Sequence, residues 1–250
     1  MMNFNHATVD DIPLIWYEPP ENERRHLVIW LNGFSGSKES VKTDLESLAE
    51  AGFVALAFDP YQHGERLVET VEELRDRIRG NIRRNFWPIL AHTAEETSKV
   101  IDWAIGNLSV EEAVGMGGVS MGGDISVTAA GIDHRIAAVS ALVATPDWLR
   151  PGSFEPPGEP DETAQCCYDR CNPLTHLEHY VNCPAITFQS GAEDQQVPPD
   201  GGQRFAEALS STYANCPEKL KVVLHEGVAH GRCDGMMENS IAWFSKWLGT

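Results

Sequence analysis

The residues best suited to chemistry in this chain form the run Gly118-Val119-Ser120-Met121-Gly122, which has the spacing G-x-S-x-G. An apolar stretch, 113–116, precedes this run, and a stretch rich in small residues, 125–130, follows it. A strand, a sharp turn and a helix in this order would hold the serine on a strained turn with its Oγ exposed, as a nucleophile requires. A glycine-rich turn in which Ser120 caps the helix accounts for the same pattern, so the motif alone leaves both interpretations open.

A serine nucleophile needs a histidine base and a carboxylate that orients the histidine. In one arrangement of these groups the acid and then the histidine follow the serine along the chain, each in a loop after a strand. Asp194 follows the apolar run 186–189, and His230 follows the apolar run 220–224. We therefore predict a catalytic triad of Ser120, Asp194 and His230. The less favoured candidates for the acid and the base are Glu193 and His225.

The negative charge that develops on a carbonyl oxygen during such an attack needs backbone N–H donors, which form an oxyanion hole. The residue after the nucleophile, Met121, offers one donor at the start of the expected helix. The second is expected from the loop 32–39, where Gly33 permits an unusual backbone conformation. We predict that the N–H of Phe34 is this second donor, and a turn that caps the following helix is compatible with that role.

Six apolar runs of strand length recur along the chain. Because they are apolar at nearly every position, they are typical of strands buried on both faces of a parallel sheet. The runs are 27–31, 53–58, 113–119, 136–143, 184–189 and 220–224. The helical patterns that alternate with them are 40–51, 89–105, 203–209 and 240–248. This alternation predicts an α/β fold with a mostly parallel central sheet and helices on both faces.

Three segments depart from this alternation. Residues 14–17 are expected to form an antiparallel edge strand, and the highly charged segment 67–84 is expected to form an exposed helix. The segment 145–180 contains six prolines and is predicted to be an irregular lid that forms part of a pocket wall.

Length and charge limit the classes of protein that the chain can represent. Its 250 residues suit a single α/β domain, 1–250, and its formal net charge of −18 argues against binding to nucleic acid or anionic membranes. No apolar run approaches the roughly 20 residues that a membrane-spanning helix needs, and the N-terminus has no signal-peptide features. We therefore expect a cytoplasmic protein, and the oligomeric state is left open.

The cysteines offer the first test for a metal site. Cys166, Cys167 and Cys171 lie close together, but a zinc site usually needs a second, separated pair of ligands, and the chain has no such pair of cysteines. Without an export signal, reduced thiols are the expected state. We therefore expect no metal.

Several segments resemble the α/β-hydrolase superfamily, and the resemblance extends from Leu27 to Leu248. The loop 32–39 looks like the H-G-F-x-G-x-K-E loop of dienelactone-hydrolase-like and prolyl-oligopeptidase-like esterases. The segment 59–66 is similar to the D-x-x-x-H-G-x-R segment of the same group, and the segments 172–174 and 194–198 also match.

Two positions depart from the family pattern. Asn32 replaces the usual histidine before Gly33, and Ser120 stands where true dienelactone hydrolases carry cysteine. The resemblance implies hydrolysis of carboxylic esters with small to medium acyl groups through an acyl-enzyme, with no cofactor. A serine aminopeptidase or amidase on the same triad is the alternative, and a non-catalytic ligand-binding protein is less favoured.

Aromatic and imidazole side chains near the expected site are candidates for contacts with a small-molecule ester. These candidates are Phe34, Tyr61, His63 and Trp148. Tyr61 and His63 follow a strand end and are equally compatible with surface loops, and Trp148 lies in the expected lid.

Overall fold

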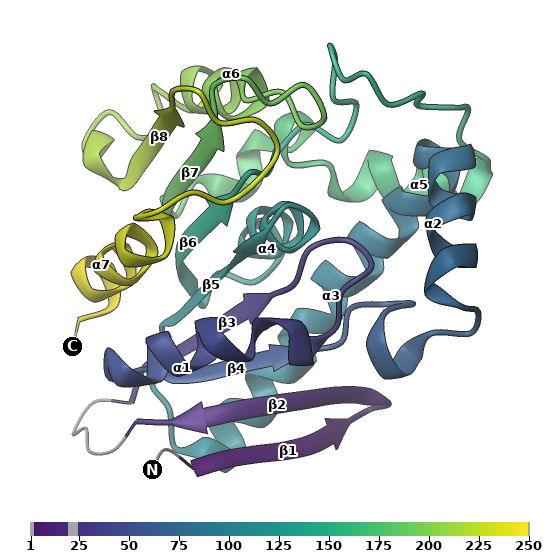
Figure 1. The fold of residues 1–250 in the computed structure, drawn as a ribbon. Helices are drawn as coiled ribbons and strands as arrows, with labels where there is room; N and C mark the ends of the chain where they lie inside the picture. The colour runs from purple at the N-terminus through teal and green to yellow at the C-terminus, as the bar shows by residue number, and fades with distance from the viewer. Residues whose placement is uncertain (1–2, 20–24, 250) are drawn as a thin grey trace.

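The computed structural model describes residues 3–19 and 25–249. Its strands are β1 (Asn3–Val9), β2 (Ile12–Glu18), β3 (Leu27–Leu31), β4 (Val54–Phe58), β5 (Val114–Val119), β6 (Ile136–Leu142), β7 (Ala185–Gly191) and β8 (Leu220–His225). They form one eight-stranded sheet in the order β1-β2-β4-β3-β5-β6-β7-β8, which Figure 1 shows from bottom to top. The pairs β1–β2 and β2–β4 are antiparallel, and all the others are parallel. The six apolar runs are therefore confirmed as strands.

Helices connect the parallel strands. The α-helices are α1 (Lys42–Glu50), α2 (Val71–Gly80), α3 (Ile82–Leu108), α4 (Met121–Ile132), α5 (Glu162–Cys171), α6 (Asp200–Ala208) and α7 (Met236–Leu248). The 3-10 helices are η1 (Lys38–Val41), η2 (Gly64–Arg66), η3 (Pro173–Thr175), η4 (Leu177–Tyr180) and η5 (Pro217–Lys219). None of the helices within the described ranges is both long and apolar enough to cross a membrane.

The sheet is buried on both faces, as its apolar strands require. On one face, α1 and α7 contribute Leu45, Leu48 and Phe244 to a core with strand residues such as Trp30. On the other face, α3 and α4 contribute residues such as Val100 and Ile125 to a second, larger core. Helices on both faces are therefore confirmed.

The N-terminal edge of the sheet differs from the expectation. Residues 14–17 lie in an antiparallel strand, β2, but β1 covers it and takes the edge position. β1 has no apolar run, because exposed side chains such as Phe4 and Thr8 alternate with half-buried ones such as Ala7. A strand with one face open to solvent lacks the continuous apolar signal on which the other strands were predicted.

Two segments are more regular than expected. The charged segment 67–84 contains α2 and the start of α3, which are separated at Asn81. The Oδ1 of Asn81 caps α3 by accepting the N–H of Arg84 at 3.0 Å. The segment 145–180 is not wholly irregular, because it contains α5, η3 and η4. Asp161 begins α5 by accepting the N–H of Ala164 at 2.9 Å, so the irregular part lies before residue 161.

The junction between β5 and α4 is packed closely against β3. A methyl group on either Gly118 or Gly122 would overlap the carbonyl oxygen of Leu31. Overlap with backbone is costly, because the strand cannot move without breaking its ladder. These two glycines therefore allow the turn that carries Ser120 to lie directly above the end of β3.

We expect Gly118→Ala to lower the free energy of unfolding by about 1–3 kcal/mol, because the added methyl group overlaps the Leu31 carbonyl. The matched control is Gly106→Ala in α3, where a methyl group meets no atom within 4 Å. It is expected to raise the free energy of unfolding by about 0.5–1 kcal/mol. Urea denaturation measures both, and equal unfolding midpoints for the two variants would contradict the prediction.

Candidate active site

Ser120 lies on the sharp turn between β5 and α4, in a backbone conformation that non-glycine residues rarely adopt. Its φ is 52° and its ψ is −113°. Its N–H donates to the carbonyl of Leu142 in the neighbouring strand β6 at 2.7 Å, which fixes the turn to the sheet. Strained backbone of this kind persists where the surrounding structure enforces it, and it is concentrated at functional sites.

The structure brings Ser120, His230 and Asp194 into one chain of hydrogen bonds. His230 Nε2 lies 3.1 Å from Ser120 Oγ, and His230 Nδ1 lies 2.7 Å from Asp194 Oδ2. Because a carboxylate can only accept, the hydrogen of the neutral ring is placed on Nδ1. Nε2 is then free to accept the serine hydroxyl hydrogen.

Asp194 is fully buried and held rigidly in the loop after β7. Its second oxygen, Oδ1, accepts the N–H groups of Gln196 at 3.0 Å and Val197 at 2.8 Å. These bonds fix the carboxylate plane, so the remaining oxygen faces the imidazole. A buried carboxylate with both oxygens occupied is positioned to orient a base.

The loops that carry Asp194 and His230 are bonded directly to each other. The N–H of Glu193 donates to the carbonyl of Val228 at 3.0 Å. Gly191 lies so close to this second loop that a methyl group there would overlap the same carbonyl. The rival candidates are placed elsewhere: Glu193 has an exposed side chain, and His225 belongs to β8 itself.

The two amides expected to stabilise an oxyanion lie at the same edge of the sheet. β3 and β5 are paired in parallel with Leu31 opposite Gly118, so the loops after these strands are adjacent. Met121 is the first residue of α4, where helical N–H groups have no acceptor within the helix. Phe34 lies in a tight turn in which the carbonyl of Gly33 accepts the N–H of Gly36 at 3.1 Å.

Asn32, the residue that departs from the family pattern, contributes to this same turn. Its Nδ2 donates to the carbonyl of Gly33 at 2.9 Å, and its side chain is almost completely buried. The carbonyl of Gly33 therefore accepts two hydrogen bonds, which fixes the peptide that joins Gly33 to Phe34. Asn32 thus supports the loop geometry directly.

A buried ion pair holds the loop after β3 against the loop after β4. The fully buried carboxylate of Asp59 accepts the backbone N–H of Lys38 at 2.9 Å and its Nζ at 2.8 Å. The N–H of Glu65 donates to the same carboxylate at 2.9 Å. Burial alone would lower the pKa of Lys38, but hydrogen bonds to Asp59, Glu65 and Glu39 outweigh it and raise the pKa. The matching segments 32–39 and 59–66 are therefore structurally coupled.

A cavity of about 80 Å³ opens at Ser120. Its other lining residues are Phe34, Ile78, Arg79, Ile82, Phe86, Arg150, Glu155 and Gln196. A second, more open hollow of about 750 Å³ has Asp194, His230 and Phe154 in its wall, and Gln196 belongs to both. Ser120 therefore lies at a small, partly open cavity, and His230 and Asp194 lie at a wider one. Since Arg150 and Glu155 come from the segment 145–180, this segment forms part of the wall.

Two of the expected substrate contacts, Tyr61 and His63, do not line the cavity at Ser120. The ring of Tyr61 packs against His92, with centroids 5.0 Å apart. His63 is fully buried behind Phe34, with ring centroids 5.8 Å apart, and burial lowers the pKa of His63. The expectation is corrected because the loop after β4 turns inward against α3, where the N–H of Tyr61 donates to Thr93 Oγ1 at 3.0 Å.

Trp148 is also absent from the lining of this cavity, but it lines an adjoining cavity of about 190 Å³ that shares Ile82, Arg150 and Glu155 with it. It is almost completely buried. Its backbone N–H donates to Asn172 Oδ1 at 2.9 Å, and its backbone carbonyl accepts the indole N–H of Trp87 at 3.1 Å. These bonds fix its backbone between α3 and the end of α5. Phe34 is the one expected contact residue that lines the cavity at Ser120.

Arg150 was not among the predicted site residues, and it links the cavity wall to α4. Its Nη2 donates to the fully buried Asp124 at 2.6 Å, and its guanidinium lies 5.2 Å from the centroid of the Phe86 ring. Asp124 also accepts the N–H of Thr145 at 2.7 Å. Burial raises the pKa of Asp124, and the charge of Arg150 opposes this effect. One arginine in a proline-rich segment gives no sequence signal for such a distant partner.

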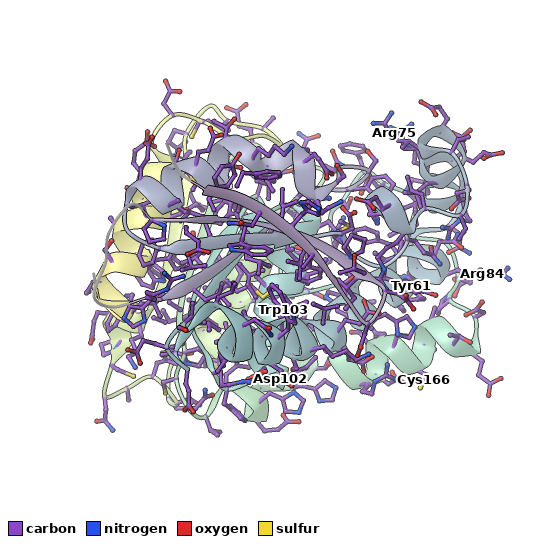
Figure 2. All side chains as sticks on the ribbon, turned by 90° about the horizontal axis from the view of Figure 1, so that it is seen from below. Tyr61, Arg75, Arg84, Asp102, Trp103 and Cys166 are labelled. Carbon is purple, nitrogen blue, oxygen red and sulfur yellow. The ribbon has the colours of Figure 1, made fainter. Side chains whose placement is uncertain are left out.

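The three neighbouring cysteines lie on α5. Cys166 is exposed and projects outward from the helix, as Figure 2 shows. Cys167 and Cys171 are buried, and burial raises the pKa of both thiols, that of Cys171 to about 12 with a contribution from Glu95. The two buried thiols are therefore protonated at neutral pH, which disfavours metal binding by this trio.

The sequence matches the dienelactone hydrolase family over residues 14–238. The chain belongs to this family. Among curated proteins, this family member is similar to the Bacillus subtilis (strain 168) protein named "Putative esterase YitV", with 27% identity over 99% of this chain and 100% of the relative. The family assignment establishes a hydrolase of the expected superfamily.

Solved structures show the same fold. The crystal structure of TT1662 from Thermus thermophilus superimposes with a TM-score of 0.82 at 22% identity, covering 100% of this chain and 99% of that one. A puromycin-hydrolyzing peptidase of Mycobacterium tuberculosis gives a TM-score of 0.74 at 18% identity, covering 99% of this chain and 40% of the peptidase. The α/β-hydrolase fold of this family member is therefore confirmed.

We expect Arg150→Met to lower the free energy of unfolding by about 3–5 kcal/mol at neutral pH, because it leaves the buried Asp124 carboxylate without its cation. Without Arg150 the folded-state pKa of Asp124 rises further, so a larger fraction is neutral as the pH falls. The loss should therefore be smaller at pH 5 than at pH 8, as measured by urea denaturation at both values.

The control for this prediction is Arg84→Met. Arg84 forms an exposed ion pair with Asp161, and Figure 2 shows its side chain at the periphery of the molecule. Loss of an exposed pair is expected to cost at most about 1 kcal/mol. Equal losses of unfolding free energy in the two variants would show that the buried ion pair contributes no more to stability than the exposed one.

Proposed function

We propose that this protein is a serine esterase that hydrolyses carboxylic esters of small to medium acyl groups through an acyl-enzyme on Ser120. The observation that carries the proposal is the continuous hydrogen-bond chain from Ser120 through His230 to Asp194, with a small cavity opening at Ser120. A strained serine, a base with a free Nε2 and a buried orienting carboxylate together support nucleophilic catalysis.

Acylation follows from this geometry. His230 Nε2 accepts the proton of Ser120 Oγ as the oxygen attacks the ester carbonyl, and Asp194 stabilises the imidazolium that forms. The N–H groups of Phe34 and Met121 donate to the oxyanion. In comparable enzymes, each such donor stabilises the transition state by about 3–4 kcal/mol. The imidazolium then protonates the departing alcohol as the carbon–oxygen bond breaks.

Deacylation repeats the same steps with water. His230 takes a proton from the attacking water, the oxyanion forms again at the same amides, and the proton returns to Ser120 Oγ as the acid leaves. All these steps use groups of the chain and the substrate, so the proposal needs no metal or cofactor. The cytoplasmic location, the small-molecule ester substrate and the expectation of no binding to nucleic acid or membranes remain predictions.

The cavity supports the proposed size of the acyl group. Its volume of about 80 Å³ suits a short acyl chain. Phe34, Ile78, Ile82 and Phe86 form the apolar part of its wall, and Arg79, Arg150, Glu155 and Gln196 form the polar part. The wider hollow beside His230 offers open space for the leaving alcohol. A short acyl group with a variable alcohol is therefore the proposed class of substrate.

We expect Ser120→Ala to lower kcat/KM on p-nitrophenyl esters by at least about 10⁴-fold, because the nucleophile is absent. Ser211→Ala, at an exposed serine outside the site, should retain the wild-type value. Rates are measured on a series from acetate to decanoate, with circular dichroism as the folding control. The optimum should fall among the shorter chains. Equal rates in wild type and Ser120→Ala would remove the proposed nucleophile.

The leaving group distinguishes an esterase from the alternative peptidase or amidase. We expect turnover of p-nitrophenyl butyrate and no turnover of aminoacyl p-nitroanilides by the same wild-type preparation, because amides are the harder substrates for the same triad. Hydrolysis of the anilides that is lost in Ser120→Ala would assign an aminopeptidase or amidase. If Ser120→Ala kept both ester and anilide hydrolysis, both assignments would be contradicted.

A further inference from the structure

Three potential metal ligands converge on the side of α4, at the end of the helix remote from Ser120. His176, Glu178 and His179 each offer a ligand atom, and these atoms all lie within 4.8 Å of one another. They belong to η4 and the residue before it, between α5 and β7. A methyl group on Gly131, in the last turn of α4, would lie 3.2 Å from His179 Cβ, which places the group there.

The orientation of His176 is fixed by a backbone carbonyl. Its Nε2 lies 2.7 Å from the carbonyl oxygen of Asp169, near the end of α5. Because a carbonyl oxygen only accepts, Nε2 carries a hydrogen and the Nδ1 of the neutral ring carries a lone pair. A carbonyl or carboxylate that holds the outer nitrogen in this way is the usual partner of a metal-binding histidine.

The free nitrogen of His176 faces another acceptor. Nδ1 lies 3.1 Å from Glu178 Oε1, which is also an acceptor when ionised. Two acceptors at hydrogen-bond distance repel each other unless a cation lies between them, either a proton on the ring or a metal ion. The contact therefore marks a position where positive charge is favourable.

His179 supplies the third ligand at the same position. Its ring stacks on that of His176 with centroids 5.0 Å apart and an angle of 10°, and its Nε2 lies 4.0 Å from the same Glu178 oxygen. In a tetrahedral zinc site with bonds of about 2.0–2.1 Å, ligand atoms are about 3.4 Å apart. The distances of 3.1 and 4.0 Å lie on either side of this value. A metal ion lies in the plane of each imidazole that binds it, so the partly exposed His179 ring must turn out of the stack for both rings to reach one ion.

We propose that His176 Nδ1, the Glu178 carboxylate and His179 Nε2 bind a divalent transition-metal ion of the zinc class, with water completing the coordination. Two imidazoles and one carboxylate suit Zn²⁺, Ni²⁺ and Co²⁺, whereas Ca²⁺ and Mg²⁺ prefer oxygen ligands. Bound metal would link η4 to the end of α5 through His176. The site is separate from the proposed esterase chemistry and does not depend on it.

The expectation of no metal was drawn from the cysteines, and it is revised by this proposal. The sequence His176-Leu177-Glu178-His179 places two histidines three residues apart, which a 3-10 turn brings to the same side. The sequence does not reveal that this segment forms a 3-10 helix, so the spacing of the two histidines alone gives no sign of a metal site.

The test uses the full chain after treatment with a chelator and a thiol reductant. Isothermal titration with Zn²⁺ should give one site per chain, and its affinity should fall at least tenfold in His179→Ala and in Glu178→Gln. His6→Ala, at an exposed histidine on the edge strand β1, should bind as the wild type does. Saturating Zn²⁺ should raise the Tm of the wild type and leave that of His179→Ala unchanged.

A competing role for the cysteines is tested directly. Co²⁺ bound at the proposed site should show no thiolate charge-transfer absorption, and Cys166→Ser should retain full Zn²⁺ affinity. Thiolate absorption, loss of binding in Cys166→Ser, or unchanged affinity in both site variants would overturn the proposal. The absence of stoichiometric binding to the folded wild type would overturn it equally. Esterase rates of the variants report separately on the triad.

Discussion

The conformation of Ser120 is the constraint on which the rest of the site depends. Its backbone is held at φ 52° because β5 must end, reverse direction and enter α4 within a few residues. That path is open only because Gly118 and Gly122 approach the carbonyl of Leu31 without side chains. Ser120 is therefore positioned by backbone packing between β3, β5 and α4, and its own side chain contributes little to its placement.

Two independent supports flank this turn. On one side, the buried pair of Lys38 and Asp59 joins the loop after β3 to the loop after β4 and so places the Phe34 amide. On the other side, hydrogen bonds between the loops after β7 and β8 place Asp194 against His230. The parallel sheet brings these loops to one edge, so each support is local while the site that they form is assembled from the whole chain.

Much of the fold followed from the sequence, because strands buried on both faces leave continuous apolar runs. The order of Ser120, Asp194 and His230 was likewise visible, since each follows such a run. β1 was not predicted, because its solvent-exposed face interrupts the apolar pattern. Arg150 escaped for a different reason: its partner Asp124 lies 26 residues away, and no local pattern specifies a buried ion pair between a helix and an irregular segment.

Aromatic residues were the least predictable part of the site. Their types suggested contacts with substrate, but size and apolar surface also favour burial, and the outcome depends on which neighbours are available. The backbone of Trp148 is hydrogen-bonded to the side chains of Asn172 and Trp87, and His63 packs behind Phe34. Of the side chains chosen as a pocket lining, Phe34 lines the cavity at Ser120, whereas His63 lies beneath it.

Phe34 joins two tasks that are usually assigned to different residues. Its ring forms part of the cavity wall and contacts His63 and Phe86, while its peptide N–H is the proposed donor to the developing charge. An oversized acyl group that pushes this ring aside must also displace the amide. Selection among substrates would then be expressed in turnover rather than in binding, because a badly fitting chain is held but poorly stabilised at the transition state.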